Sequence, residues 1–178
     1  MMAATEELDP PALSNLLAFH RSIRASLEVF DETASLASIG LVDVVKASAL
    51  YDFFVGPMQW HDEDEGRSLL PRLLRADPAR FNDVVAACRD EHTRMEATLA
   101  SVLLHLREVS FAGAEPDPEL LRAAALQLRE VLEPHLHREE TAIFPAARRL
   151  LTTADLDEMT SEMRARRLRR MIKRRGED

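Results

Sequence analysis

The chain has 178 residues, 46% of them hydrophobic and 30% charged, a balance typical of a soluble globular protein with one sizeable core. The formal net charge of −8 disfavours nucleic acid and anionic membranes as partners, and the single cysteine excludes a disulfide within the chain. No apolar run is long enough to cross a bilayer, so a cytoplasmic protein is expected.

Hydrophobic residues recur at steps of three and four along most of the chain, which predicts helices. The predicted helices run from 11 to 37, from 41 past 71, from 78 to 109, from 118 to 151 and from 154 to 172. Pro57, Pro134 and Pro145 are expected to kink or bend the helices that contain them. Short loops between long helices predict an all-α, antiparallel up-down four-helix bundle at residues 11–151. A short C-terminal fifth helix and a basic tail follow at 152–178, outside the core.

One phrase occurs twice in the chain. Residues 61–71 read "HDEDEGRSLLP" and residues 135–145 read "HLHREETAIFP", with His first, Glu fifth, a large apolar residue tenth and Pro last. A second, weaker repeat links "HRSIRASL", which begins at His20, to "HTRMEATL", which begins at His92. The repetition suggests a duplicated helical hairpin inside one bundle.

Six polar residues fall on the apolar faces of the four long helices, where they would be buried. They are His20, His61, Glu65, His92, His135 and Glu139. Each Glu follows a His by four residues and therefore shares its helical face. Buried carboxylates need a charged partner, and four imidazoles with two carboxylates suit a pair of metal ions, with carboxylate bridges.

The alternative to a metal site is that these residues are ordinary core or surface side chains. A single His on an apolar face is more often a hydrogen-bonded core residue, and exposed His–Glu pairs at this spacing are common. Here, two His–Glu pairs have the same spacing and are each followed by an apolar residue and Pro. The two remaining long helices each carry a His on their apolar face, and together these features favour a metal site. Ferritin-like di-iron bundles place Glu three residues before His, which is the reverse order, so that class is disfavoured.

The pattern resembles the hemerythrin-like family, also called the HHE cation-binding domain. His20, "HDEDE", "EH" at 91–92 and "HLHREETAIFP" carry the resemblance, which covers roughly residues 13–150. It implies a four-helix bundle around two iron ions joined by an oxo or hydroxo bridge. The two carboxylates Glu65 and Glu139 would bridge the irons, and the four His would be terminal ligands.

The resemblance also implies a function in binding or sensing dioxygen or a related small molecule, in a redox, nitric oxide or peroxide response. The alternatives are a di-iron enzyme that reduces peroxide or nitric oxide with an electron donor, and an iron storage or delivery protein. The sequence does not decide whether the protein is an enzyme. It leaves the oligomeric state open as well.

The chain departs from the oxygen carriers of this family, which have a fifth His where this sequence has Cys88. This departure argues against reversible oxygen carriage of the familiar kind. Cys88 could ligate as a thiolate or be a small buried hydrophobe, and Glu96 or water could complete the site instead. Glu140, five residues after His135, is the alternative to Glu139 as the second bridge.

A basic run at 164–175, "RARRLRRMIKRR", carries eight positive charges and no negative one. The plain interpretation is a solvated helix end, which the helix dipole favours. The other is a contact with an acidic partner, either a nucleic acid or an acidic face of this protein.

Overall fold

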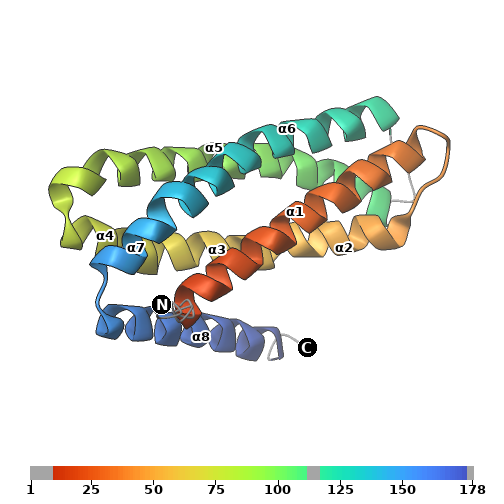
Figure 1. The fold of residues 1–178 in the computed structure, drawn as a ribbon. Coiled ribbons are helices and arrows are strands. Elements are labelled where there is room, and N and C mark those ends of the chain that lie inside the picture. Colours follow the sequence, from red (N-terminus) through yellow and green to blue (C-terminus); the bar gives the residue numbers. More distant parts are fainter. Residues whose placement is uncertain (1–9, 112–116, 176–178) are drawn as a thin grey trace, which may run out of the picture.

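The computed structural model describes residues 10–111 and 117–175, and every element within these ranges is helical (Figure 1). In chain order the elements are α1 Pro11–Ala37, α2 Val44–Val55, α3 Pro57–Asp64, η1 Glu65–Leu69, α4 Leu70–Ala76, α5 Pro78–Phe111, α6 Pro118–Arg138, η2 Glu139–Ile143, α7 Phe144–Leu150 and α8 Thr153–Arg175. The predicted all-α fold is confirmed. None of the described helices is both long and apolar enough to span a membrane.

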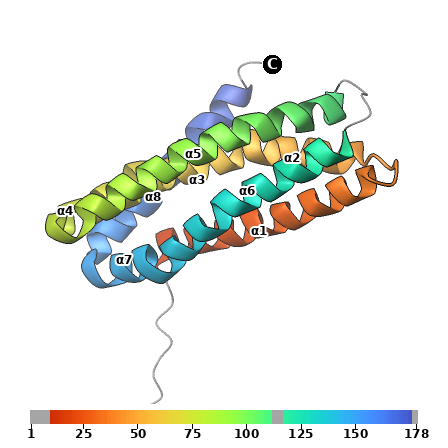
Figure 2. The same ribbon diagram turned by 90° about the horizontal axis from the view of Figure 1, so that it is seen from above.

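Four rods form the bundle, and two of them are built from several helical pieces. The first rod is α1, the second runs from α2 to α4, the third is α5 and the fourth runs from α6 to α7 (Figures 1 and 2). Each rod contacts its two neighbours around the bundle, since α1 packs on α2 and α6, and α5 packs on the same two helices.

The rods begin and break where the local sequence dictates. Asp43 accepts a hydrogen bond from the backbone N–H of Lys46 at 3.0 Å and caps α2. Asp117 caps α6 in the same way, with Pro118 at its first position. Gly56 leaves helical geometry (φ −111°, ψ −84°), so the second rod breaks at Gly56–Pro57, as the sequence predicted.

Each copy of the repeated phrase contains a π-helical turn. These turns, η1 and η2, begin at Glu65 and Glu139. In each turn the N–H of the apolar tenth residue of the phrase, Leu70 or Phe144, bonds to the C=O of the Glu five residues earlier. The Pro that follows has no N–H, and its ring would clash with the carbonyl four residues before it. The wider π turn is what the chain forms immediately before each of these prolines.

The π turn also shifts the buried face of the fourth rod by one residue. A straight helix would place Ala142 on the buried stripe of the fourth rod, but Ala142 is exposed and Ile143 is buried instead. A π turn contains one more residue than an α turn, so the inward face moves one position along the chain.

The core consists of two separate clusters of apolar side chains. The loop-end core includes Ile23, Leu27, Phe30, Phe54, Val102, Leu106 and Leu128. The α8-end core includes Leu13, Leu16, Leu70, Phe81, Val85, Phe144 and Met159. His20 lies between Leu16 of one cluster and Ile23 of the other, so a polar layer divides the core across the bundle.

Helix α8 confirms the predicted C-terminal fifth helix but corrects the prediction that this helix lies outside the core. It is 23 residues long and packs across the α7 end of the bundle, where Leu156, Met159 and Met163 join the α8-end core (Figure 1). Its amphipathic face is narrow, which is why the sequence pattern alone did not indicate that it would be buried.

The basic run on α8 meets an acidic face of the same protein. Arg166 Nε donates to Asp64 Oδ1 at 2.7 Å, and Arg167 lies 3.2 Å from the other oxygen of Asp64. Arg170 lies 2.6 Å from Glu63, and Arg166 also donates to Ser68 Oγ at 2.6 Å. The interpretation as a solvated helix end is therefore wrong for these arginines; the side chains of 173–175 lie outside the described residues.

Candidate metal centre

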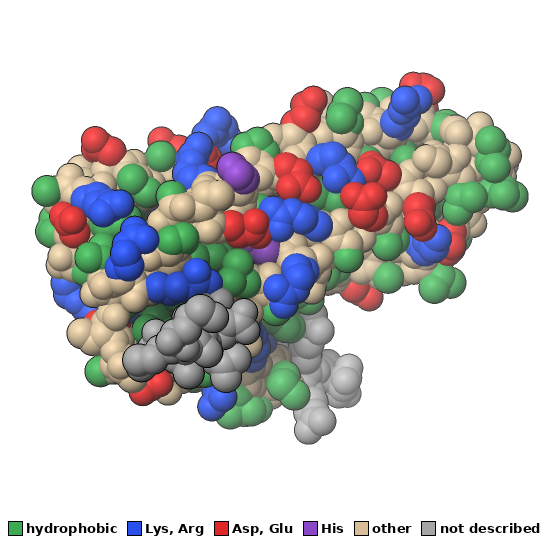
Figure 3. All heavy atoms as spheres, in the orientation of Figure 1, with side chains coloured by type: hydrophobic (Ala, Val, Ile, Leu, Met, Phe, Trp, Pro, Cys, Tyr) green, Lys and Arg blue, Asp and Glu red, His purple; other side chains and the backbone are tan. Residues whose placement is uncertain are grey.

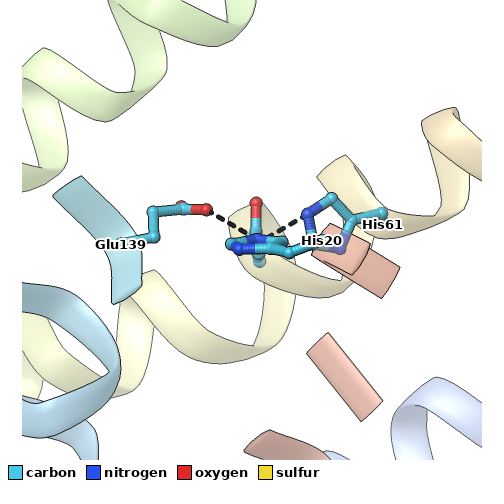
Figure 4. Close-up of side chains that lie close together, drawn as sticks. His20, His61 and Glu139 are labelled. Carbon is cyan, nitrogen blue, oxygen red and sulfur yellow. Dashed lines mark ion pairs between the residues drawn. The ribbon is translucent and has the colours of Figure 1, made fainter. Parts of the chain in front are cut away.

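The polar layer brings together all six seam residues that the sequence singled out. His20 comes from α1, His61 from α3, His92 from α5 and His135 from α6, while Glu65 and Glu139 open the two π turns. His20, Glu65 and Glu139 have no solvent-exposed surface. Figure 4 shows His20, His61 and Glu139 pointing toward one another from different rods.

The six residues form two overlapping groups that could each hold a metal ion. One group is His20, His61, Glu65 and Glu139, and the other is Glu65, His92, His135 and Glu139. In each group the candidate ligand atoms all lie within 4.8 Å of one another. Both carboxylates belong to both groups, which is the arrangement that bridging carboxylates require.

Several buried polar atoms of this layer have no hydrogen-bond partner among the described residues, which fits a metal. Both oxygens of Glu65, both oxygens of Glu139 and both ring nitrogens of His61 have no hydrogen-bond partner among the described residues. The ion-pair distances are 3.1 Å for His61 Nε2 to Glu65 and 3.3 Å for His20 Nε2 to Glu139. Buried polar atoms are normally satisfied, so this set fits cations held by nitrogen and oxygen.

Burial and nearby charges shift the pKa values of the titratable groups in the layer in different directions. Burial lowers the pKa of His61 to about 4. Burial also acts to lower the pKa of His20 and His92, but the Glu139 and Glu65 carboxylates outweigh it and raise these values to about 10 and about 9. Burial and the Glu65 charge raise the pKa of Glu139 to about 7.

Metal loading is therefore expected to release protons. His20 and His92 hold a proton at pH 7 in the metal-free layer, and a metal ligand must be deprotonated. The apparent metal affinity should rise as the pH rises from 7 toward 9. Titration calorimetry in two buffers of different ionisation enthalpy measures the protons released; equal heats in both buffers would contradict the expectation.

Two of the histidines donate a hydrogen bond from Nδ1, the nitrogen that faces away from the centre, to a carboxylate. The sequence did not indicate this role for either carboxylate. His20 Nδ1 donates to Glu140 Oε1 at 2.9 Å, and His135 Nδ1 donates to Glu91 Oε2 at 3.0 Å. Each hydrogen bond fixes the ring so that Nε2 faces the centre of the layer. The carboxylates are in turn bound by arginines, Glu140 by Arg24 at 2.7 Å and Glu91 by Arg138.

The arginine–carboxylate pair on His20 lies on a face of mixed charge. Acidic and basic side chains alternate across the side of the bundle formed by α1 and α6 (Figure 3). Arg24 binds Glu133 at 3.1 Å as well as Glu140, and Arg129 binds Asp31 at 2.5 Å. The signal for these contacts in the sequence was faint, because their partners are more than 90 residues apart.

Glu140→Gln is expected to weaken metal binding by about 10- to 100-fold, as loss of such an outer carboxylate typically does. The change removes the charge that orients His20 while leaving the inner ligands in place. Competition with a chelator at equilibrium measures the metal affinity of the variant and of the wild type. Glu133→Gln is the matched control, since Glu133 binds the same Arg24 without touching His20, and an equal loss there would contradict the assignment.

The sequence left open which further residues could be ligands, and the candidates occupy different positions in the structure. Glu139 lies in both groups, whereas Glu140 faces the back of His20. Cys88 is fully buried in the α8-end core, and burial raises the pKa of its thiol to about 12. Glu96 is exposed and belongs to neither group.

Comparison with known proteins gives one family. The description of the matching family model is the hemerythrin HHE cation-binding domain, and it matches twice, over residues 12–126 and 83–174. The overlapping matches are consistent with a chain whose two halves carry the same phrase. A search of curated proteins found no match. Since the first match alone spans more than half of the chain, the protein belongs to the hemerythrin HHE cation-binding domain family.

Proposed function

We propose that the protein holds a non-haem di-iron centre and binds or senses dioxygen or a related small molecule, in a redox, nitric oxide or peroxide response. The observation that carries the proposal is the pair of groups that share Glu65 and Glu139, whose buried carboxylate oxygens have no hydrogen-bond partner among the described residues and lie close to the imidazole nitrogens of both groups. A membership in a cation-binding family supports the same conclusion.

The two groups of candidate ligands support a role for each residue. Glu65 and Glu139, which belong to both groups, would hold both ions, His20 and His61 would hold one ion, and His92 and His135 would hold the other. Bound iron supplies redox and Lewis-acid chemistry. The protein excludes water on the His20 and His61 side, where Phe144 lies 5.1 Å from the His20 ring and Phe19 stacks on His61 at 4.7 Å.

A second candidate is an enzyme that reduces peroxide or nitric oxide, drawing electrons from a separate donor. The exposure of His92 favours this enzyme. The His92 side chain is 11% exposed to solvent, whereas His20 and Glu65 are fully buried. We also propose a cytoplasmic location, which the single, unpaired Cys88 supports.

An anaerobic titration with ferrous iron tests the proposal. Binding should saturate at about two ions per chain, as a site with two bridging carboxylates requires. Admission of oxygen should then change the visible absorption, and removal of the gas should reverse the change if the protein binds or senses dioxygen. Sustained consumption of peroxide or nitric oxide with a reductant would favour the enzyme. A folded protein that takes up no iron would refute both.

A further inference from the structure

A pocket of about 620 Å³ opens between α3, η1 and α5 and reaches the candidate metal centre. His92 lies in its wall, and among the six residues of the polar layer it is the one that lines this pocket. His92 Nε2 lies 3.5 Å from Glu65 Oε2 and 3.3 Å from His135 Nε2. The pocket therefore leads from solvent to an imidazole that touches one of the shared carboxylates.

The pocket wall carries more negative than positive charge. Three carboxylates, Asp62, Glu63 and Glu96, face one guanidinium, Arg67. Glu63 is already paired with Arg170 at 2.6 Å, whereas Asp62 and Glu96 form no ion pair among the described residues. One oxygen of Asp62, Oδ1, is inaccessible to solvent and has no hydrogen-bond partner there. The exposed Glu96 is therefore available to bind a cation beside the candidate ligand His92. Burial raises the pKa of Asp62 to about 7, so Asp62 adds a full negative charge only above neutral pH.

The other sides of the centre are less suited to admitting a cation. The smaller opening at His135, of about 290 Å³, is lined by two arginines, Arg94 and Arg138, as well as by Glu91 and Glu130. Its Glu91 is engaged by both His135 and Arg138. The His20 and His61 side is closed by aromatic rings.

We propose that divalent cations enter through the pocket beside His92, and that Asp62 and Glu96 bind the incoming ion before it passes to His92 and Glu65. The proposal rests on the proposed function, since it assumes that the centre binds metal. Carboxylate oxygens bind hard divalent cations readily, while the imidazole and carboxylates beyond them form the permanent site. Negative charge in a cleft also raises the local cation concentration and the association rate.

Stopped-flow mixing of the metal-free protein with Co²⁺ tests this route, with the visible absorption of bound cobalt as the signal. Glu96→Gln should slow the second-order uptake, and Asp62→Asn with Glu96→Gln should slow it by about tenfold or more at low ionic strength. The amount of cobalt bound at the end should not change. Added salt should reduce the difference between wild type and variants.

The controls distinguish the route from other effects of charge. Glu130→Gln makes the same change at the opening beside His135 and should leave the uptake rate unchanged. Asp62 adjoins His61, so the double variant could alter the metal centre itself. In that case the uptake rate of the single variant at the exposed Glu96 tests the route. Equal rates in wild type and Glu96→Gln, or an equal loss in Glu130→Gln, would overturn the route. Failure of the wild type to bind cobalt would instead count against the proposed function.

Discussion

Glu65→Gln is expected to abolish metal loading at both positions of the centre. Glu65 belongs to both groups of ligands, so the amide removes a bridging charge from each ion at once. His61→Ala removes a ligand from one group alone and should leave the His92 and His135 position able to bind. Metal analysis after dialysis measures the bound ions, which should fall to near zero in the first variant and persist in part in the second.

Thermal unfolding gives an independent measurement of the Glu65 effect. A metal present at a hundredfold excess over its Kd stabilises the folded state by about 2.7 kcal/mol, and Glu65→Gln should lose this gain. Glu108→Gln is the matched control, because Glu108 lies on the exposed part of α5 and belongs to neither group. Full loading of Glu65→Gln would show that the carboxylate does not bridge.

Arg166→Ala is expected to destabilise the fold by about 1–3 kcal/mol, the usual cost of removing hydrogen bonds from a buried charged group, because Arg167 remains 3.2 Å from Asp64 and still pairs with it. Asp64 is 1% exposed, and Arg166 binds its Oδ1 while also donating to Ser68 in η1. Burial already raises the pKa of Asp64, which the arginines oppose, so its charge depends on them. Urea unfolding of the metal-free protein measures the change.

A double-mutant cycle separates the ion pair from the loss of packing. Asp64→Asn combined with Arg166→Ala should be less destabilised than the two single changes added together. Arg169→Ala is the control on the same helix, because Arg169 is exposed, and it should change stability by less than about 0.5 kcal/mol. A similar loss in Arg169→Ala would mean that helix α8 is sensitive to any loss of charge.

The fold and the position of the polar layer could be predicted because both depend on the periodicity of a regular helix. His20 and His92 lie on the apolar faces of unbroken helices, where steps of three and four identify the buried positions. The same rule failed at Ala142, because a π turn changes the periodicity and is recognised from backbone hydrogen bonds rather than from composition.

The outer contacts of the site could not be predicted for a different reason. The hydrogen bond between Glu140 and His20 joins residues 120 positions apart, and the bond between Glu91 and His135 joins residues 44 apart. Such pairs depend on how helices rotate against one another, which helical periodicity does not fix. The acidic partner of the basic run could likewise be proposed from the sequence but not located, because Asp64 lies about a hundred residues before Arg166 and Arg167.

The division of the core by the polar layer has a consequence for how the protein opens. The two apolar clusters are separate, and the layer between them is polar, with buried carboxylate oxygens that have no hydrogen-bond partner among the described residues. The two ends should then exchange their amide hydrogens as distinct cooperative units in the metal-free protein. A metal pair bound as proposed would take ligands from all four rods and would couple these units. Loading should therefore merge them into one unit, detectable as a common rate of amide exchange along α1 and α5.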